Sequence, residues 1–229
     1  HELRTRLHEL GSDLIFLQEV QGQHERHARR FEHWPDEPQD VFLATSPKLR
    51  HTFETAYGRN ASYLHGHHGN ALLSRYPIVG LENRDISDHA LEKRGVLHCV
   101  VQVGRLQVHC FVVHFGLLAR SRERQLGALI DWVSREVGAD APLIIAGDFN
   151  DWHNRAGNLI AERLGLVEVF GGLNGQPARS FPATLPMFRL DRIYVRGFDV
   201  KQTEVHHGLP WSAISDHAAL SAHLARHGG

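Results

Sequence analysis

The apolar run at residues 143–146 (Leu-Ile-Ile-Ala) constrains the fold more than any other stretch, because it does not alternate with polar residues. Such a run is typical of a strand that is covered on both faces of its sheet. It stops at Gly147, and Asp148, Asn150 and Asp151 follow. Ligands of open α/β sheets bind at the carboxyl ends of the strands. A single Gly-Asp pair is better explained by a turn, so a catalytic role requires further polar residues elsewhere in the chain.

The charge balance is nearly even, with 25 Lys and Arg against 26 Asp and Glu in 229 residues. The chain therefore has no overall basic field that would draw it to nucleic acid. No apolar run approaches the ~20 residues of a membrane-spanning helix, and no signal peptide is visible. These absences predict a cytoplasmic protein, and we expect a monomer.

Two cysteines, Cys99 and Cys110, are too few for a disulfide scaffold. A two-residue turn at Gly104-Arg105 would place them opposite each other in a hairpin. Because this register makes them a hydrogen-bonded pair, which is the less favourable site for a bridge, we predict two free, packed thiols.

The apolar periodicity predicts a layered chain of helices and strands. Helices are expected at 2–10, 21–32, 39–44, 126–137 and 155–164, a Gly-rich loop at 171–186, and strands at 14–20, 52–57, 71–74, 96–103, 106–113, 143–146, 190–195, 199–205 and 220–224. A first helix that feeds a core strand normally follows an earlier strand, so we expect a truncated N-terminus with that first strand missing. No repeat or linker divides the sequence, which predicts one domain over residues 1–229, built of two packed sheets and flanking helices.

Polar side chains adjoin many of these strands. The set comprises Glu19, Asn70, His114, Asp148, Asn150, Asp191, Asp216 and His217. Each alone is more often a turn or surface residue, but together they offer carboxylates, amides and two imidazoles at one edge of a sheet. Oxygen ligands without a Cys or His cluster suit Mg²⁺, or Mn²⁺, rather than Zn²⁺. A carboxylate-bound Mg²⁺ with nearby His and Asp is suited to phosphoester hydrolysis.

Six segments in this order give the chain a family resemblance. They are Leu17-Gln18-Glu19-Val20, the segment 69–78 that begins Gly69-Asn70-Ala71, Val113-His114-Phe115, Gly147-Asp148-Phe149-Asn150, Leu190-Asp191-Arg192-Ile193 and Ser215-Asp216-His217. The series resembles the endonuclease/exonuclease/phosphatase superfamily, in a bacterial-type form, and covers nearly the whole chain. The resemblance implies an α/β fold, a four-layer sandwich in which helices flank two packed, mostly antiparallel mixed sheets. It also implies Mg²⁺-dependent hydrolysis of a phosphoester.

By this resemblance, Glu19 is the principal metal ligand and Asp216 lies beside it. The first strand of the family normally ends in an Asn that helps to position the metal, and this chain starts after that strand.

The same resemblance implies the catalytic roles. Asp148 and Asn150 would orient or activate the attacking water and hold the phosphate. His217, supported by Asp191, would activate the water or polarise the phosphate, and His114 would donate to a phosphoryl oxygen. Which residue is the formal base is left open.

Candidates for substrate binding are Asn70, His67, His68 and Arg94. The histidine-rich segment 65–68 is interpreted either as a Zn²⁺ or Ni²⁺ site or, with greater weight, as a solvated loop that can still line the substrate cleft. The abasic-site enzymes carry a phosphate-contacting Tyr at the position of His67, so the abasic-endonuclease interpretation is weakened. Arg94 is either a phosphate contact or an edge-strand charge.

The substrate itself is left open by these residues, because a fold and its catalytic set do not choose it. Lysine is scarce (Lys48, Lys93 and Lys201), and a nuclease would be expected to carry rows of basic residues. We therefore expect a phosphodiesterase or phosphatase acting on a phosphoester derived from nucleic acid or phospholipid, with a DNA endonuclease or exonuclease as the alternative. A non-catalytic phosphate-binding module is the alternative of another class. Phe181 and Phe188 either stack on a substrate group or pack their own loop.

Overall fold

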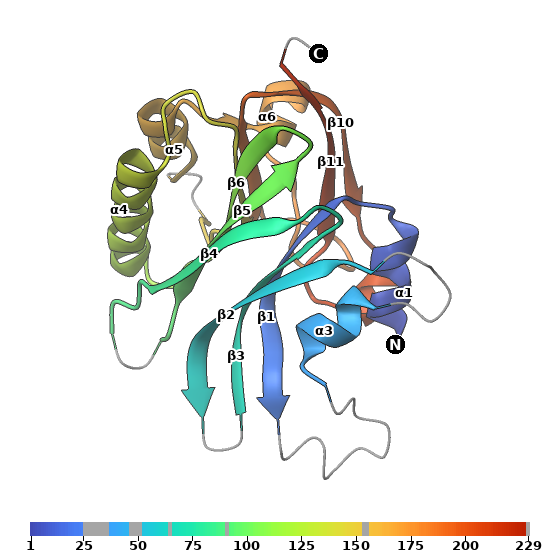
Figure 1. The fold of residues 1–229 in the computed structure, drawn as a ribbon. Helices are drawn as coiled ribbons and strands as arrows, with labels where there is room; N and C mark the ends of the chain where they lie inside the picture. The colour runs from blue at the N-terminus through green and yellow to red at the C-terminus, as the bar shows by residue number, and fades with distance from the viewer. Residues whose placement is uncertain (25–36, 46–51, 64–65, 90–91, 153–155, 228–229) are drawn as a thin grey trace. The chain divides into compact units, whose positions relative to one another are not determined.

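The computed structural model of the chain describes residues 1–24, 37–45, 52–63, 66–89, 92–152 and 156–227 (Figure 1). These residues form a mixed α/β structure of several sheets flanked by helices, as the sequence predicted. The chain divides into two compact units, His1–His114 and Phe115–Gly229. None of the helices in the described ranges is long and apolar enough to cross a membrane.

The first unit contains two antiparallel sheets (Figure 1). Its elements are α1 (Glu2–Glu9), β1 (Leu14–His24), α3 (Gln39–Ala44), β2 (Glu54–Tyr63), β3 (Gly66–Ser74), β4 (Ile78–Asp85), β5 (Gly95–Val103) and β6 (Leu106–His114). One sheet has the order β1-β3-β2, and β4, β5 and β6 pair in sequence. Strands of the first group contact strands of the second, and fully buried side chains such as Leu72, Leu97 and Phe111 fill the interior. Burial of apolar side chains on both groups of strands therefore holds the unit together.

Two short helices cover part of the β1-β3-β2 sheet. Leu7 of α1 and Leu43 of α3 are buried in one apolar cluster with Ile15, Phe53 and Leu73. The imidazole Nε2 of His8 lies 3.0 Å from the carbonyl oxygen of Leu43 and links the two helices.

The second unit carries the buried strand that the sequence predicted at residues 143–146. Its elements are α4 (Ala119–Glu136), β7 (Leu143–Asp148), α5 (Ala156–Leu164), β8 (Val167–Glu168), α6 (Val169–Asn174), β9 (Asp191–Arg196), β10 (Phe198–His206), the 3₁₀ helix η1 (Trp211–Ala213) and β11 (Ala219–Arg226). Every residue of β7 is buried. β7, β9 and β8 pair antiparallel, and β10 pairs antiparallel with β11. The pairing of β7 with β9 brings Asp148 opposite Asp191.

The predicted hairpin is confirmed, with Cys99 of β5 directly opposite Cys110 of β6. Both cysteines are buried and free. Burial raises the pKa of the Cys99 thiol to about 12 and that of Cys110 well above its ordinary value, so both stay protonated and unreactive.

Two sequence predictions of secondary structure are corrected, and one strand was not predicted. Residues 21–24 extend β1 along β3 and are not helical, because the pairing resumes after an irregularity at residues 18–19; the rest of the helix predicted at 21–32 lies outside the described residues. Residues 78–85 form β4, a polar edge strand without clear alternation, which the sequence did not predict. The predicted Gly-rich loop begins inside α6, which ends at Gly175 in the left-handed conformation.

Replacing Gly69 by alanine should lower the free energy of unfolding by about 3 kcal/mol or more. A Cβ atom on Gly69 would lie 1.9 Å from the carbonyl oxygen of Gly58 on the paired strand β2, so the backbone would have to move. Urea denaturation measures the change. Gly127→Ala on α4 is the matched control, because a Cβ atom at this position would meet no atom within 4 Å. The free energy of unfolding of this variant should rise by up to ~1 kcal/mol. Equal stability of Gly69→Ala and the wild type would contradict the close approach.

Candidate active site

The turn after β7 fixes Asp148 and Asn150 against each other. The Oδ1 atom of Asp148 accepts from the backbone N–H of Asn150 at 2.8 Å, and its Oδ2 atom accepts from the side-chain Nδ2 of Asn150 at 3.1 Å. That Nδ2 also donates to the carbonyl oxygen of Phe115 at 2.9 Å. Between the two polar residues, Phe149 points into the core and contacts Phe115 and Tyr194 edge-on. The turn therefore holds the Asp148 carboxylate in a single orientation.

Backbone strain accompanies this turn and one position in the first unit. Asn150 has φ 47° and Glu19 has φ 55°, and among the described residues these are the two non-glycine residues with positive φ. Such conformations cost energy and concentrate at functional sites. Both residues were already candidates from the sequence, so the backbone provides an independent reason to retain them.

His217 and Asp191 form a close pair. The Nδ1 atom of His217 lies 2.7 Å from Oδ2 of Asp191, the first residue of β9. The backbone around His217 is tied to a neighbouring loop: Ala218 N–H donates to Ser180 O at 2.7 Å, and Ala183 N–H donates to Asp216 O at 2.7 Å. Asp216 is exposed beside this pair. The pairing that resemblance implied between His217 and Asp191 is therefore present in the structure.

The surroundings of His217 raise the pKa of its imidazole to about 9. Burial lowers the pKa, but the hydrogen bond to Asp191 and its charge, with the charges of Asp148 and Asp216, outweigh burial. The ring is therefore an imidazolium at pH 7. Its Nδ1–H donates to Asp191 and its Nε2–H remains a donor, so His217 is suited to polarising a phosphoryl oxygen and not to accepting a proton from water.

In the metal-free protein, Asp191→Asn should lower the pKa of His217 by roughly 1–3 pH units, because the main opposing charge is removed while burial remains. Because the pKa is raised on folding, protonated His217 stabilises the fold fully below about pH 6.5, and this contribution is lost as the pH rises through about 9. An NMR titration of the imidazole with EDTA present measures the pKa. An unchanged pKa in the variant would show that Asp191 does not hold the charge.

His67 and His68 lie on β3, which corrects the interpretation of this segment as a solvated loop; His65 is outside the described residues. Strand pairing accounts for the difference, because residues 66–68 of β3 pair with β2, and Gly66 and His68 also pair with β1. The Nδ1 atom of His67 lies 2.9 Å from the hydroxyl oxygen of Tyr57 on β2. Its ring also occupies the space over Gly22, where a Cβ would lie 1.8 Å from it. Neither Tyr57 nor Gly22 could be predicted from the sequence as a neighbour of His67.

His68 lies in the electrostatic field of two other candidates. Burial lowers its pKa, the Glu19 charge raises it and the Arg94 charge lowers it further, with a net decrease. The nearby Arg94 makes an ion pair with Glu92 at 3.1 Å, and both side chains are largely buried. The charges of Glu19 and Arg94 therefore act on the His68 imidazole in opposite directions.

Asn70 and His114 are buried in the first unit. The Nδ2 atom of Asn70 donates to the carbonyl oxygens of Gly95 at 2.9 Å and Val112 at 3.1 Å, so its amide joins β3 to β5 and β6. His114 ends β6 and is 7 % exposed. Their predicted contacts with substrate stay predictions.

Within the part of the chain that the structure describes, no three His, Cys, Asp or Glu side chains gather as a metal cluster. The carboxylates of Glu19 and Asp216 are nevertheless hard oxygen donors, and they match the preference of Mg²⁺ and Mn²⁺ for such ligands. The metal assignment stays a prediction.

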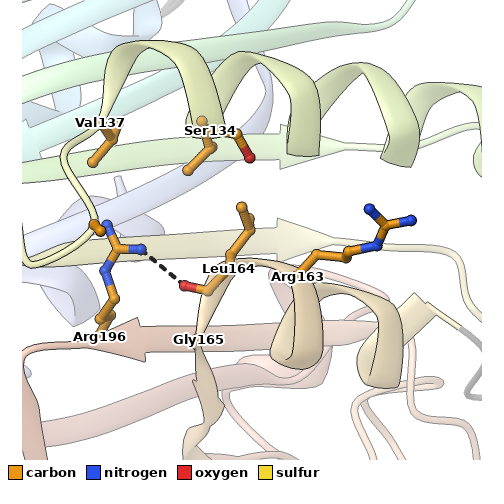
Figure 2. A pocket seen from close by; sticks show the side chains of 8 residues that line it. Ser134, Val137, Arg163, Leu164, Gly165 and Arg196 are labelled. Atoms are coloured by element: carbon orange, nitrogen blue, oxygen red, sulfur yellow. Dashed lines mark hydrogen bonds between the residues drawn. The ribbon is translucent and has the colours of Figure 1, made fainter.

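A pocket between the end of α4 and the end of α5 contains none of the candidate residues (Figure 2). Arg196 lines it and donates to three carbonyl oxygens, those of Ala141, Leu164 and Gly138, at 3.1, 2.8 and 2.7 Å. Figure 2 shows the bond to Leu164, with the exposed Arg163 side chain extending away from it. The guanidinium of Arg196 therefore joins helix and strand ends, and we assign this pocket a structural role.

Residues 1–217 match the Endonuclease/Exonuclease/phosphatase family, and the chain belongs to this family. The three activities in the family's name all hydrolyse phosphoesters. One relative is the Uncharacterized protein YbhP of Escherichia coli strain K12, which is 44% identical over 225 residues, covering 97% of this chain and 87% of YbhP.

Solved structures of known proteins share the fold. The mannosyl-6-phosphatase Bt3783 of Bacteroides thetaiotaomicron superimposes with a TM-score of 0.71 at 16% identity, covering 98% of this chain and 89% of that one. TDP2 of D. rerio, complexed with a single strand DNA product, superimposes with a TM-score of 0.69 at 17% identity, covering 98% and 90%. One fold thus serves a sugar phosphatase and a protein that holds DNA, so the fold does not identify the substrate.

Proposed function

We propose that this chain is a Mg²⁺-dependent hydrolase, with Mn²⁺ as an alternative metal, that cleaves a phosphoester by attack of an activated water. The observation that carries the proposal is the close pair of His217 and Asp191, whose Nδ1 and Oδ2 atoms lie 2.7 Å apart. The charges of Asp191, Asp148 and Asp216 raise the pKa of this imidazole. A fixed cation next to an oriented carboxylate supplies both an electrophile and a proton acceptor. The family membership supports the same class of reaction.

In this mechanism, the Nε2–H of His217 donates to a non-bridging phosphoryl oxygen and stabilises the charge that develops there. Asp148, oriented by two bonds from Asn150, accepts a proton from the water as its oxygen attacks phosphorus. The bond from phosphorus to the leaving oxygen breaks, and the leaving group departs as the alkoxide, which takes a proton from solvent. His114 is proposed as a further donor to the phosphoryl group, and Asn70, His67, His68 and Arg94 as substrate contacts, on the family resemblance.

Glu19 and Asp216 are the residues that we propose to hold the metal. When bound, a divalent ion supplies charge neutralisation at the phosphoryl and leaving oxygens. The strained backbone of Glu19 and the exposed carboxylate of Asp216 support their choice.

Turnover of bis(p-nitrophenyl) phosphate, compared with p-nitrophenyl phosphate, tests the proposal and distinguishes a phosphodiesterase from a phosphatase. We expect p-nitrophenolate release that requires Mg²⁺ or Mn²⁺ and is lost in Asp148→Asn. A supercoiled plasmid tests the nuclease alternative, which would appear as nicking that persists in moderate salt. Binding of inorganic phosphate without turnover of any of these substrates would instead favour the non-catalytic binding module.

A further inference from the structure

Three aromatic side chains form a cluster beside the His217 imidazole, all within the second unit. Trp152 lies 5.0 Å from Phe188 and 6.2 Å from Phe181, both in edge-on arrangements, measured between ring centroids. Phe181 lies 6.5 Å from Phe188 and 5.0 Å from the ring of His217. The cluster thus continues directly into the candidate catalytic pair.

The backbone that carries these rings is the backbone that positions the catalytic residues. Phe181 and Phe188 face each other across a short antiparallel bridge, with the N–H of Phe188 donating to the carbonyl oxygen of Phe181 at 2.8 Å. Ser180, which precedes this bridge, accepts from Ala218, the residue after His217. The backbone N–H of Trp152 donates to the carbonyl oxygen of Asn150 at 3.1 Å. The cluster is therefore anchored at both the His217 and the Asn150 sides of the site.

Burial separates this cluster from the core aromatics. Trp152 is 40% exposed and Phe188 is 42% exposed, whereas Phe115 and Phe149 of the same unit are fully buried. If packing of the loop were the whole function of the rings, their mutual contacts would leave little ring area in water. Exposed aromatic area gathered at a site is instead typical of a surface that binds a ligand.

We propose that Trp152, Phe181 and Phe188 form a subsite that stacks a planar ring borne by the phosphoester substrate. The inference rests on the proposed function and deepens it, since it names the substrate class. Because Phe181 contacts the His217 ring, a phosphate that accepts from His217 would carry its substituent toward the cluster. A nucleobase or an aryl alcohol would supply the ring, and both present a flat π-face to the protein.

Two esters with the same leaving group test the stacking. Phenyl p-nitrophenyl phosphate and cyclohexyl p-nitrophenyl phosphate both release p-nitrophenolate, and their second substituents are both six-membered rings, but only phenyl is planar. We expect the wild type to favour the phenyl ester by about 10-fold in kcat/KM. Trp152→Leu and Phe188→Leu should reduce this ratio toward one. The ratio is insensitive to general damage, because a damaged catalytic pair lowers both rates alike.

Leu185→Ala is the matched control, since Leu185 is a 70% exposed apolar residue of the same loop without a ring; it should keep the wild-type ratio. Thymidine 5′-(p-nitrophenyl phosphate) then distinguishes the sources of the ring. A kcat/KM higher than that of the phenyl ester would identify the stacked ring as a nucleobase. An equal or lower kcat/KM would identify it as the ring of an aryl alcohol. Equal rates for the phenyl and cyclohexyl esters in the wild type would overturn the proposal.

A binding experiment separates this inference from the proposed function. Phenylphosphonate and cyclohexylphosphonate are not hydrolysed, and their affinities can be measured by calorimetry on the wild type and both leucine variants. Tighter binding of phenylphosphonate that is lost in the variants supports the subsite even if no ester is turned over, in which case only the hydrolase proposal fails. Equal affinities alongside normal turnover would overturn the subsite and leave the hydrolase proposal standing.

Discussion

Replacing His217 by alanine should lower kcat/KM for bis(p-nitrophenyl) phosphate by roughly 10²–10⁴-fold, the usual contribution of a positioned acid or base. The loss is expected to be large because His217 is the charged donor of the site, with a pKa raised to about 9. The variant also leaves Asp191 without its partner at 2.7 Å. Steady-state kinetics at saturating Mg²⁺ measures the effect.

His223→Ala is the matched control, because His223 is an exposed histidine on β11 and is not among the candidate residues. It should keep the wild-type kcat/KM. His217→Gln is a second variant, which keeps a side-chain donor but has no charge. Its kcat/KM should lie between those of the wild type and His217→Ala. Activity of His217→Ala within twofold of the wild type, with an unchanged melting temperature, would remove His217 from the mechanism.

The identity of the candidate residues was largely predictable from sequence, because strand ends carry local signals. Asp148 follows an unbroken apolar strand and Asp191 begins one, and the structure places them opposite each other in the β7–β9 pairing. The charge state of His217 was not predictable. It depends on a balance between burial and three carboxylates, two of them distant in sequence, and such a balance is set by tertiary distances.

The structure around His67 was missed for a related reason. Gly66, His67 and His68 have the composition of a loop, yet tertiary pairing places them in the middle strand of a sheet, which overrides local preference. The role of Gly22 in making room for the His67 ring has no local signal at all. The exposed ring of Trp152 shows the same limit, since its partners Phe181 and Phe188 are 29 and 36 residues away in sequence.

Glu19→Gln should raise the Mg²⁺ concentration needed for half-maximal activity by more than about 10-fold, the effect seen when the support of a metal ligand is removed. Glutamine keeps the size of the side chain and one oxygen but loses the negative charge that a hard divalent ion prefers. The wild type should lose activity in EDTA and regain it when Mg²⁺ is added back. A Mg²⁺ titration of bis(p-nitrophenyl) phosphate hydrolysis measures the half-maximal concentration.

Charge loss elsewhere should not reproduce this shift, which separates a ligand from a general electrostatic effect. Glu123→Gln removes the same charge from an exposed position of α4 and should titrate with Mg²⁺ like the wild type. Because φ is positive at Glu19, Glu19→Gly should relieve backbone strain and increase stability while abolishing activity, a combination that a purely structural glutamate would not give. Full activity of the wild type in EDTA, together with an unshifted Glu19→Gln titration, would contradict the role of Glu19 as a metal ligand.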